Sequence, residues 1–390
     1  MLSFISNKIE KIVNYFIIND NKIILNLENN NLTTLPNITS KLFILNCNYN
    51  KLLELPNDLP NDLRLLECNY NNLIKLPDVL PNELSTLYCK VNNLTILPDT
   101  LPDKLLSLDC SFNKLETLPN TLPLNLAELN ASNNILNKLP LNLPNKLKFC
   151  SFSYNKLSFI PDNLPDSITK LNLSYNKLST LPTNLPTNLE FLYCINNNLT
   201  KLPTILPNKL NTLDCYKNNL TILPTILPTN LEFLYCGNNN LTKLPDLLPE
   251  KLHTLNCYNN NLTQLPKLLP KKLHILNCNN NNLTQLPDLL PEKLHILNCN
   301  NNNLTQLPDL LPENLHTLNC SNNNLTQLPD LLPENLNTLD CSNNKDLILL
   351  PEKIPKLLIK LYCDKKQLKE ENIKQLPKNL KLYLFEDNNN

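Results

Sequence analysis

Glycine is almost absent from this chain of 390 residues, which contains only one, Gly237. Phosphate-binding loops need several glycines, because their backbone must approach the phosphates closely. The sequence therefore lacks such a loop. No histidine has an acidic residue placed to orient it, and Asp109, Asp214 and Asp340 are several repeat turns apart, too far for a catalytic carboxylate pair. We therefore expect no enzymatic activity, no catalytic residues and no cofactor.

Net charge is also absent, because 35 Lys and Arg residues balance 35 Asp and Glu residues. Without a basic surface we expect neither nucleic acid nor a membrane as partner. No apolar run approaches the ~20 residues of a membrane span. Lys8, Glu10 and Lys11 stand where a secretory signal would need an apolar core, and no small-residue cleavage site follows. We expect a cytoplasmic monomer.

What the chain contains instead is one pattern, Leu-x-x-Leu-x-Cys-x-x-Asn-x-Leu, first complete over residues 42–52. Its cysteine position recurs every 21 residues, at 47, 68, 89 and 110 and again from 194 to 341. Ala131, Phe152 and Leu173 occupy this position in the three turns between. With the flanking turns there are about eighteen copies. So short a period predicts a solenoid, in which each repeat contacts only its neighbours.

Each repeat has three parts. The first, Leu-x-x-Leu-x-Cys, alternates like a strand, so equivalent residues of successive turns should stack about 4.8 Å apart in a parallel sheet. The second is an asparagine three residues after the Cys position, kept from Asn30 to Asn344, whose amide should bond the backbone of the turns on either side. The third is Leu-Pro-x-x-Leu-Pro, which cannot form a regular helix because proline fixes φ and removes an N–H donor.

These parts predict an α/β-type solenoid, a horseshoe with a parallel β-sheet on its concave face. Its convex segments should be extended or polyproline-II-like, with at most a single tight turn. Regular helices should be few or absent beyond an N-terminal cap. Because one period runs through the chain, we expect one elongated domain.

The fourteen cysteines follow the same period. Thirteen share one repeat position, and Cys150 takes an adjacent leucine position. We expect free, buried thiols in a reducing compartment, because unpaired cysteine behaves as a small hydrophobic residue. Phe152 lies two residues after Cys150 and one turn from Ala131, so large and small side chains exchange places and the volume of the packed layer should be kept.

The two ends depart from the repeat. Residues 1–24 carry apolar residues at helical spacing, which predicts an N-terminal helical cap over the first repeat. An amphipathic membrane anchor is the alternative, but Lys8 and Lys11 are its only basic residues. Repeats of 21 residues occupy 25–344. One residue is inserted near Lys345 and the asparagines end, so we expect degenerate repeats and a C-terminal cap over 345–390.

The pattern resembles the leucine-rich repeat family in its short variety, with Leu-Pro-x-x-Leu-Pro segments such as residues 55–60. Bacterial effector proteins delivered into host cells carry a similar repeat. The Asn-, Ile- and Lys-rich composition also resembles leucine-rich repeat proteins of amoeba-infecting giant viruses. The resemblance implies a concave surface that binds a protein partner and a structural column of asparagines. Some related effectors add a ubiquitin-ligase domain with a catalytic cysteine, which we do not expect here, because only the degenerate cap follows the repeats.

Tyrosine marks the candidate binding surface. Residues directly before and after the Cys position should point outward, and eleven of the twelve tyrosines lie at the outer positions around it. Strand preference alone would not keep tyrosine out of the interior positions, whereas binding surfaces favour it for its apolar area and polar tip. We predict a partner-binding patch on the concave face, centred on residues 154–258. Its residues are Tyr154, Tyr175, Phe191, Tyr193, Tyr216, Phe233, Tyr235 and Tyr258.

The four histidines, His253, His274, His295 and His316, occupy one position in consecutive turns. Stacking should place neighbours roughly 5 Å apart, at the edge where the strands begin. Such a column could bind a transition metal, or repel itself below pH ~6.5. Tandem duplication would produce the same column without function, since the surrounding turns are near copies. We therefore predict no metal site and keep the four histidines as weak candidates.

The predicted function is a non-enzymatic protein–protein interaction scaffold that binds a protein of unknown identity on its concave face. If the viral or effector resemblance holds, it would act on a host protein in the host cytoplasm. Two alternatives remain open: a metal- or pH-responsive surface on the histidine column, and a paralogous protein with no fixed partner. The near-identical turns at 257–341 are consistent with the last.

Overall fold

The computed structural model describes residues 16–19, 22–36, 38, 42–368, 373 and 376–386. The chain divides into two compact units, Met1–Asn197 (the first unit) and Asn198–Asn390 (the second unit), where we expected one elongated domain. In a solenoid each turn contacts only its neighbours, so contacts within half of the array far outnumber those across any one boundary. A single period therefore does not imply a single compact unit.

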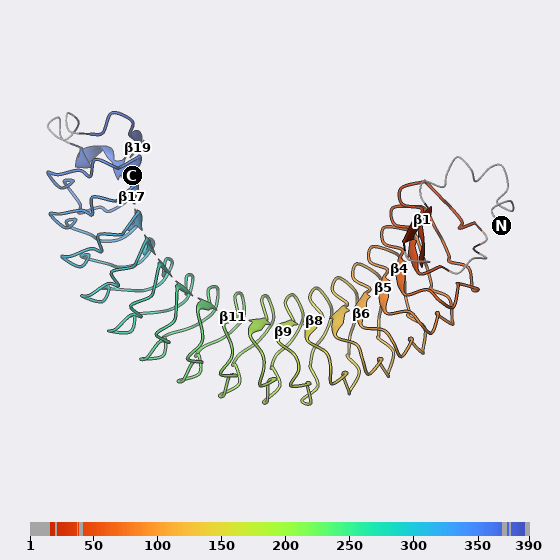
Figure 1. Ribbon diagram of the computed structural model, residues 1–390. Coiled ribbons are helices and arrows are strands. Elements are labelled where there is room, and N and C mark those ends of the chain that lie inside the picture. Colours follow the sequence, from red (N-terminus) through yellow and green to blue (C-terminus); the bar gives the residue numbers. More distant parts are fainter. Residues whose placement is uncertain are drawn as a thin grey trace. The chain divides into compact units, whose positions relative to one another are not determined.

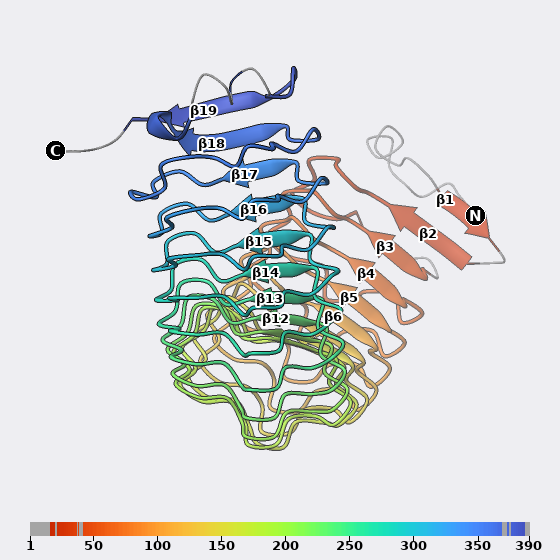
Figure 2. The same ribbon diagram turned by 90° about the vertical axis from the view of Figure 1, so that its left-hand side faces the viewer.

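A short strand recurs in each turn, and equivalent residues of neighbouring turns are paired. In the first unit β2 to β10 pair in chain order, all parallel, and β11 to β19 do so in the second. Leu45 pairs with Leu66 and Leu66 with Leu87, so the register follows the sequence period. Figure 2 shows β12 to β19 lying one above the next. The predicted parallel-strand solenoid is confirmed.

The strands of the first unit are β1 Phe16–Asn19, β2 Lys22–Asn26, β3 Ile44–Asn46, β4 Leu65–Glu67, β5 Thr86–Tyr88, β6 Ser107–Asp109, β7 Glu128–Asn130, β8 Phe149–Ser151, β9 Lys170–Asn172 and β10 Phe191–Tyr193. Those of the second unit are β11 Thr212–Asp214, β12 Phe233–Tyr235, β13 Thr254–Asn256, β14 Ile275–Asn277, β15 Ile296–Asn298, β16 Thr317–Asn319, β17 Thr338–Asp340, β18 Lys360–Asp364 and β19 Lys381–Phe385, with one 3-10 helix, η1 Lys365–Gln367. Among the described residues no helix is long and apolar enough to cross a membrane.

The strands divide the side chains of each turn between a core and an exposed surface. In β10 the central Leu192 is fully buried, whereas Phe191 and Tyr193 on either side are half-buried. The residue that follows, Cys194, is again buried. We call the surface formed by the outward residues the strand face. Within each unit it lies on the inner side of the turns, and the proline segments lie on the outer side (Figure 1).

The asparagine column joins each turn to the one before it. Asn71 Nδ2 donates to the carbonyl of Cys47 in the preceding turn at 3.0 Å and to that of Cys68 in its own turn at 3.2 Å. Its Oδ1 accepts from the backbone N–H of Leu52 at 3.0 Å. The same contacts recur along both units, and the asparagines are buried. The column therefore satisfies buried backbone groups, as predicted. Each amide bonds its own turn and the turn before it, however, and not the turns on both sides as we expected.

The proline segments are extended and contain one tight turn each. In the second turn, Leu63 N–H donates to the carbonyl of Pro60 at 3.0 Å, and the bond recurs from Leu84 to Pro81 and from Leu105 to Pro102. These turns direct the chain into the next strand. No regular helix lies on this side among the described residues, as the prolines predict.

A left-handed residue ends each strand segment, which the sequence pattern did not show us. The residue two after the Cys position has φ between 49° and 56° in every turn from Tyr49 to Asn343. Asparagine tolerates this conformation because its short polar side chain bonds locally. Val91 is the one β-branched residue there, with φ 55°. A branched Cβ crowds the backbone in this region, so Val91 is strained.

Val91→Asn should therefore stabilise the protein by about 1 kcal/mol, because it relieves left-handed strain at a non-glycine residue. The midpoint of urea denaturation, followed by circular dichroism, measures the effect. Asn259→Val, which introduces the same strain at φ 50°, should lower the midpoint by a similar amount. Equal midpoints for Val91→Asn and the parent protein would contradict this explanation.

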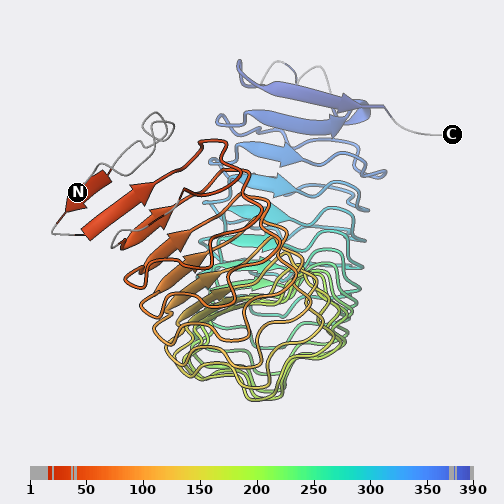
Figure 3. The same cartoon turned by 90° about the vertical axis from the view of Figure 1, so that its right-hand side faces the viewer.

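The predicted N-terminal helix is wrong for the residues of the cap that the structure describes. Residues 1–15 of the 1–24 segment lie outside the described residues, but Phe16–Asn19 forms β1, antiparallel to β2, and not a helix. Ile17 and Ile18 pair with Ile24 and Ile23. Branched side chains favour strands over helices, and the hairpin gives the first repeat strand a hydrogen-bonded neighbour. Figure 3 shows this hairpin at the N-terminal edge of the sheet.

The parallel sheet continues into the C-terminal segment. β17 pairs with β18 through Thr338 and Lys360, a shift of one residue that matches the insertion near Lys345, and β18 pairs with β19. After Asn344 the buried amide belongs to Gln367 instead. Its Oε1 accepts from the N–H of Asp364 at 3.1 Å and its Nε2 donates to that carboxylate at 3.1 Å. A glutamine in η1 thus supplies the buried amide of this turn, but it bonds Asp364 of its own turn instead of the backbone of the turn before.

All fourteen cysteines are free and buried, as their period predicts. Burial raises the pKa of Cys47 and Cys278 to about 12, so the thiolate that a nucleophile needs is scarce near neutral pH. Phe152 is fully buried in the same position, and Ala131 and Cys150 beside it are buried too. The expected exchange of large and small residues in one layer is therefore present.

Candidate functional site

Four of the eight predicted patch residues lie in the first unit. Tyr154 and Tyr175 are left-handed residues at the end of the strand segment, and their rings stack with centroids 4.0 Å apart. Phe191 and Tyr193 project from β10, and Lys170 Nζ lies 5.7 Å from the centre of the Tyr193 ring. The tyrosines thus occupy two different sites: a stacked pair at the rim and an aromatic pair on the strand face.

The other four, Tyr216, Phe233, Tyr235 and Tyr258, gather in the second unit around the single glycine. Tyr216 and Tyr258 are two turns apart, yet their ring centroids are 5.7 Å apart. Gly237 occupies the same position in the turn between them. A Cβ at Gly237 would lie 2.9 Å from two carbons of the Tyr258 ring. Because that space is open, the two rings meet across Gly237.

The acidic residue of this cluster is Asp214, which pairs in register with Tyr235. The backbone N–H of Tyr216 donates to its carboxylate at 3.1 Å. Burial raises the pKa of Asp214 to about 6, against the lowering effect of that hydrogen bond. Burial and the neighbouring Tyr216 hydroxyl raise the pKa of Tyr258 to about 12. These shifts indicate a partly dehydrated surface of aromatic rings around one carboxylate. We call Asp214, Tyr216, Phe233, Tyr235 and Tyr258 the aromatic cluster.

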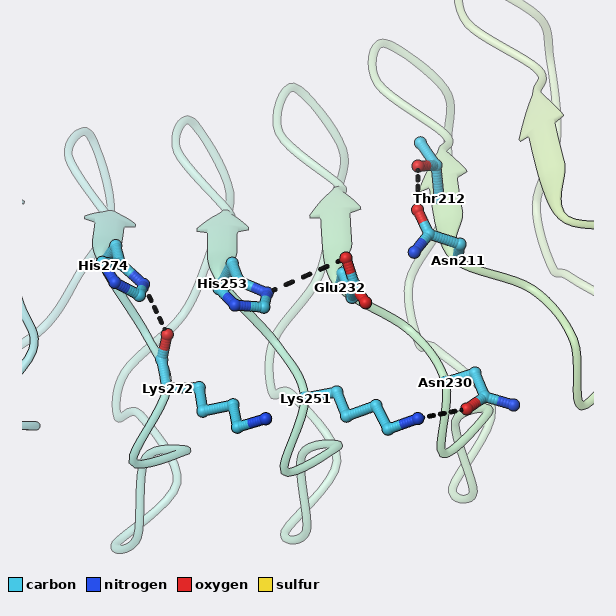
Figure 4. A network of polar contacts seen from close by, with 8 residues as sticks. All are labelled: Asn211, Thr212, Asn230, Glu232, Lys251, His253, Lys272 and His274. Atoms are coloured by element: carbon cyan, nitrogen blue, oxygen red, sulfur yellow. Dashed lines mark hydrogen bonds and ion pairs between the residues drawn. The ribbon is translucent and has the colours of Figure 1, made fainter.

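The histidine column forms as its position predicts. Centroids of successive rings from His253 to His316 are 5.3, 5.2 and 5.1 Å apart. Figure 4 shows His253 Nδ1 directed at the carboxylate of Glu232, 4.0 Å away, and His274 Nδ1 2.7 Å from the carbonyl of Lys272. In the part of the chain that the structure describes, no group of three His, Cys, Asp or Glu residues could hold a metal ion.

The structure also contains a hollow that the predicted patch did not include. On the strand face of the first unit a depression of about 500 Å³ runs over β5 to β9, with Tyr88, Asp109, Phe149 and Lys170 among its lining residues. A second hollow of about 330 Å³ shares Tyr88 and Asp109 with it. Small outward residues such as Ser107 and Ser151 leave this space open. These two serines, at outward positions of β6 and β8, were the sequence signal that the tyrosine count missed.

Comparison with known proteins gives the same architecture. The family model Leucine Rich Repeat matches residues 167–187 and 314–334. The structure of YopM, a leucine-rich effector protein from Yersinia pestis, is 36% identical with a TM-score of 0.71, covering 80% of this chain and 86% of that one. A leucine-rich repeat protein of Leptospira interrogans is 28% identical with a TM-score of 0.71, covering 92% of this chain and 94% of that one.

The functional domain of InlJ from Listeria monocytogenes, described as including a cysteine ladder, is 25% identical with a TM-score of 0.68. That match covers 78% of this chain and 68% of InlJ. Among curated proteins none matches the chain. The resemblance to giant-virus proteins stays a prediction. The period, the buried asparagine column, the parallel strands and the similarity to YopM together establish that the chain belongs to the leucine-rich repeat family.

Proposed function

We propose that this protein is a non-enzymatic interaction scaffold that binds a protein partner through its strand face. The observation that carries the proposal is the aromatic cluster, in which Tyr216 and Tyr258 meet across Gly237. Tyrosine contributes large contact area at a small entropic cost and is enriched among residues that dominate binding energy. Short strands hold these side chains in fixed positions, so little ordering is needed on binding.

The chemistry of the described residues supports binding over catalysis. Every cysteine is buried, and burial raises the pKa of a thiol such as that of Cys215. A thiol with a raised pKa is a poor nucleophile near neutral pH. Asp214 pairs in register with Tyr235, and its carboxylate accepts a hydrogen bond from the backbone N–H of Tyr216 at 3.1 Å. A rigid surface with one carboxylate and several rings is suited to recognition of another protein.

The proposal also covers the compartment in which this protein acts. YopM is described as an effector protein. We infer that this chain also acts on a host protein, in the host cytoplasm and as a monomer. The fourteen free cysteines support a reducing compartment, because disulfides would form preferentially in an oxidising one.

A triple variant in which Tyr216, Tyr235 and Tyr258 are each changed to serine should capture at least tenfold less partner from host cytosol. Loss of these interface tyrosines should remove more than about 1.4 kcal/mol of binding free energy. Immobilised parent and variant proteins would be incubated with cytosol from the same presumed host cell, and the retained proteins would be compared by quantitative mass spectrometry. Circular dichroism would verify that the variant is folded.

The matched control is a triple serine variant of Ile205, Ile226 and Leu247, which are 81%, 80% and 78% exposed in the proline segments. It removes comparable apolar surface away from the strands, so it should retain the partner. If both variants retain the same proteins as the parent, the strand face of the second unit is not the binding surface. The remaining explanations would then be binding through the histidine column, binding through the outer side, or the absence of a fixed partner.

A further inference from the structure

The smaller hollow of the first unit combines aromatic rings with carboxylates. Its volume is about 330 Å³, and its lining includes Tyr49, Glu67, Tyr70, Tyr88, Lys90 and Asp109. Tyr49 and Tyr70 stack with ring centroids 4.3 Å apart and form one wall. We call this hollow the acidic pocket. It lies wholly in the first unit and shares no residue with the aromatic cluster.

One row of residues crosses the pocket at right angles to the strands. Glu67 of β4 pairs in register with Tyr88 of β5, and Tyr88 pairs with Asp109 of β6. Neighbouring strands are about 4.8 Å apart, so a carboxylate flanks the Tyr88 side chain on each side at roughly that spacing. The row therefore places one ring between two acids.

The two carboxylates are held in different ways. Asp109 is fixed, because its Oδ1 accepts from the N–H of Ser111 at 3.0 Å and from the Ser111 hydroxyl at 2.6 Å. The carboxylate of Glu67 has no hydrogen bond or ion pair to any residue that the structure describes. Burial and the nearby carboxylate of Glu28 raise the pKa of Glu67. A cation beside Glu67 would offset both effects, because an opposite charge favours the ionised carboxylate.

The molecule already places cations against aromatic rings in this part of the sheet. Lys90 Nζ lies 5.6 Å from the centre of the Tyr70 ring, inside the acidic pocket. The Arg64 guanidinium lies 5.2 Å from the centre of the Phe43 ring. Both distances fall within the range of cation–π attraction. Lys90 thus places a positive charge in the lining of the pocket, where it would repel an incoming cation.

We propose that the acidic pocket binds the arginine side chain of a partner protein, with its guanidinium over Tyr88 and between Glu67 and Asp109. A guanidinium is planar, stacks on aromatic faces and donates in two directions, so it can satisfy a ring and two flanking carboxylates at once. The ammonium of lysine is a compact, strongly hydrated charge that stacks poorly. This site is independent of the aromatic cluster. The arginine proposal and the proposed binding function of the cluster can therefore fail separately.

The test uses two small probes, N-acetylargininamide and N-acetylcitrullinamide, which have nearly the same shape but differ in charge. Tyrosine ring signals of the full chain would be followed by NMR in ¹³C-tyrosine-labelled protein, with Tyr88→Phe assigning the Tyr88 signal. We expect the arginine probe to shift the Tyr88 and Tyr70 signals with a dissociation constant on the order of 1 mM, as ligand efficiency suggests for a probe this small. The citrulline probe should bind at least tenfold more weakly.

Two variants separate the proposal from a loss of fold. The double variant Glu67→Gln, Asp109→Asn should bind the arginine probe at least tenfold more weakly. The chemical shifts of Tyr154 and Tyr175 should not change, which shows that the variant is folded. Lys90→Met should strengthen binding of the arginine probe severalfold, because the positive charge of Lys90 no longer repels it. Misfolding cannot produce such a gain. Equal binding of both probes, no shift with the arginine probe, or tighter binding of N-acetyllysinamide would overturn the proposal.

Discussion

Asn239→Asp is expected to destabilise the second unit by at least about 3 kcal/mol, although the two side chains have nearly the same shape. Asn239 Nδ2 donates to the carbonyls of Cys215 at 3.0 Å, Cys236 at 3.2 Å and Gly237 at 3.1 Å. Its Oδ1 accepts from the N–H of Leu220 at 2.9 Å. An aspartate would place an oxygen against three carbonyl oxygens in a buried position.

The pH dependence of this variant distinguishes lost donors from general disruption. A carboxylate that faces buried carbonyls has a folded-state pKa above its unfolded value, so the folded state binds the extra proton. The contribution of this carboxyl group to stability is then fully present below its unfolded pKa of about 3.9, and it is lost as the pH rises through the folded pKa. The destabilisation of Asn239→Asp should therefore be smaller at low pH than at neutral pH. Urea denaturation followed by circular dichroism at both pH values would measure it.

Asn240→Asp is the matched control, since Asn240 is exposed and adjacent in sequence. The same change of charge in water should alter the free energy of unfolding by less than about 0.5 kcal/mol. If the two variants unfold at the same urea concentration, the asparagine column does not hold successive turns together as the hydrogen bonds indicate.

The second large effect concerns Phe152, the fully buried aromatic residue in a cysteine position. Phe152→Cys introduces the residue that most turns carry at this position, and yet we expect a loss of about 3 kcal/mol, close to the lower end for truncation of a buried phenylalanine. The reason is local: Ala131 and Cys150 are small, so no neighbour fills the cavity. Urea denaturation of the purified variant would measure the loss.

Restoring the neighbours tests the same explanation in the opposite direction. Phe152→Cys combined with Cys150→Leu and Ala131→Cys gives the usual repeat residues in all three positions, and much of the lost stability should return. Residues in contact are not additive, so the triple variant should be more stable than the sum of its single changes. A triple variant that is less stable than Phe152→Cys would show that the layer is not packed as a volume exchange.

The sequence determined the features that repeat, because each depends on one residue type in one position. Proline excludes a helix from the outer segment wherever it occurs, as the tight turn from Pro60 to Leu63 illustrates. An asparagine such as Asn71 has the donors and acceptor that its two turns require. Alternation buries Leu192 and Cys194 and leaves Tyr193 between them half-buried on the strand face. These consequences are local, so periodicity alone predicts them.

Only the tertiary structure decided where those repeated positions become sites. Tyr216 and Tyr258 meet because the turn between them carries Gly237, a coincidence of three turns that no single repeat contains. Tyr88 lies between two carboxylates because β4, β5 and β6 are neighbours in register. The strand at Phe16–Asn19 likewise depends on pairing with β2, which outweighs helical spacing. A period fixes each residue's position within its turn, but a site depends on the sizes and charges of side chains in adjacent turns.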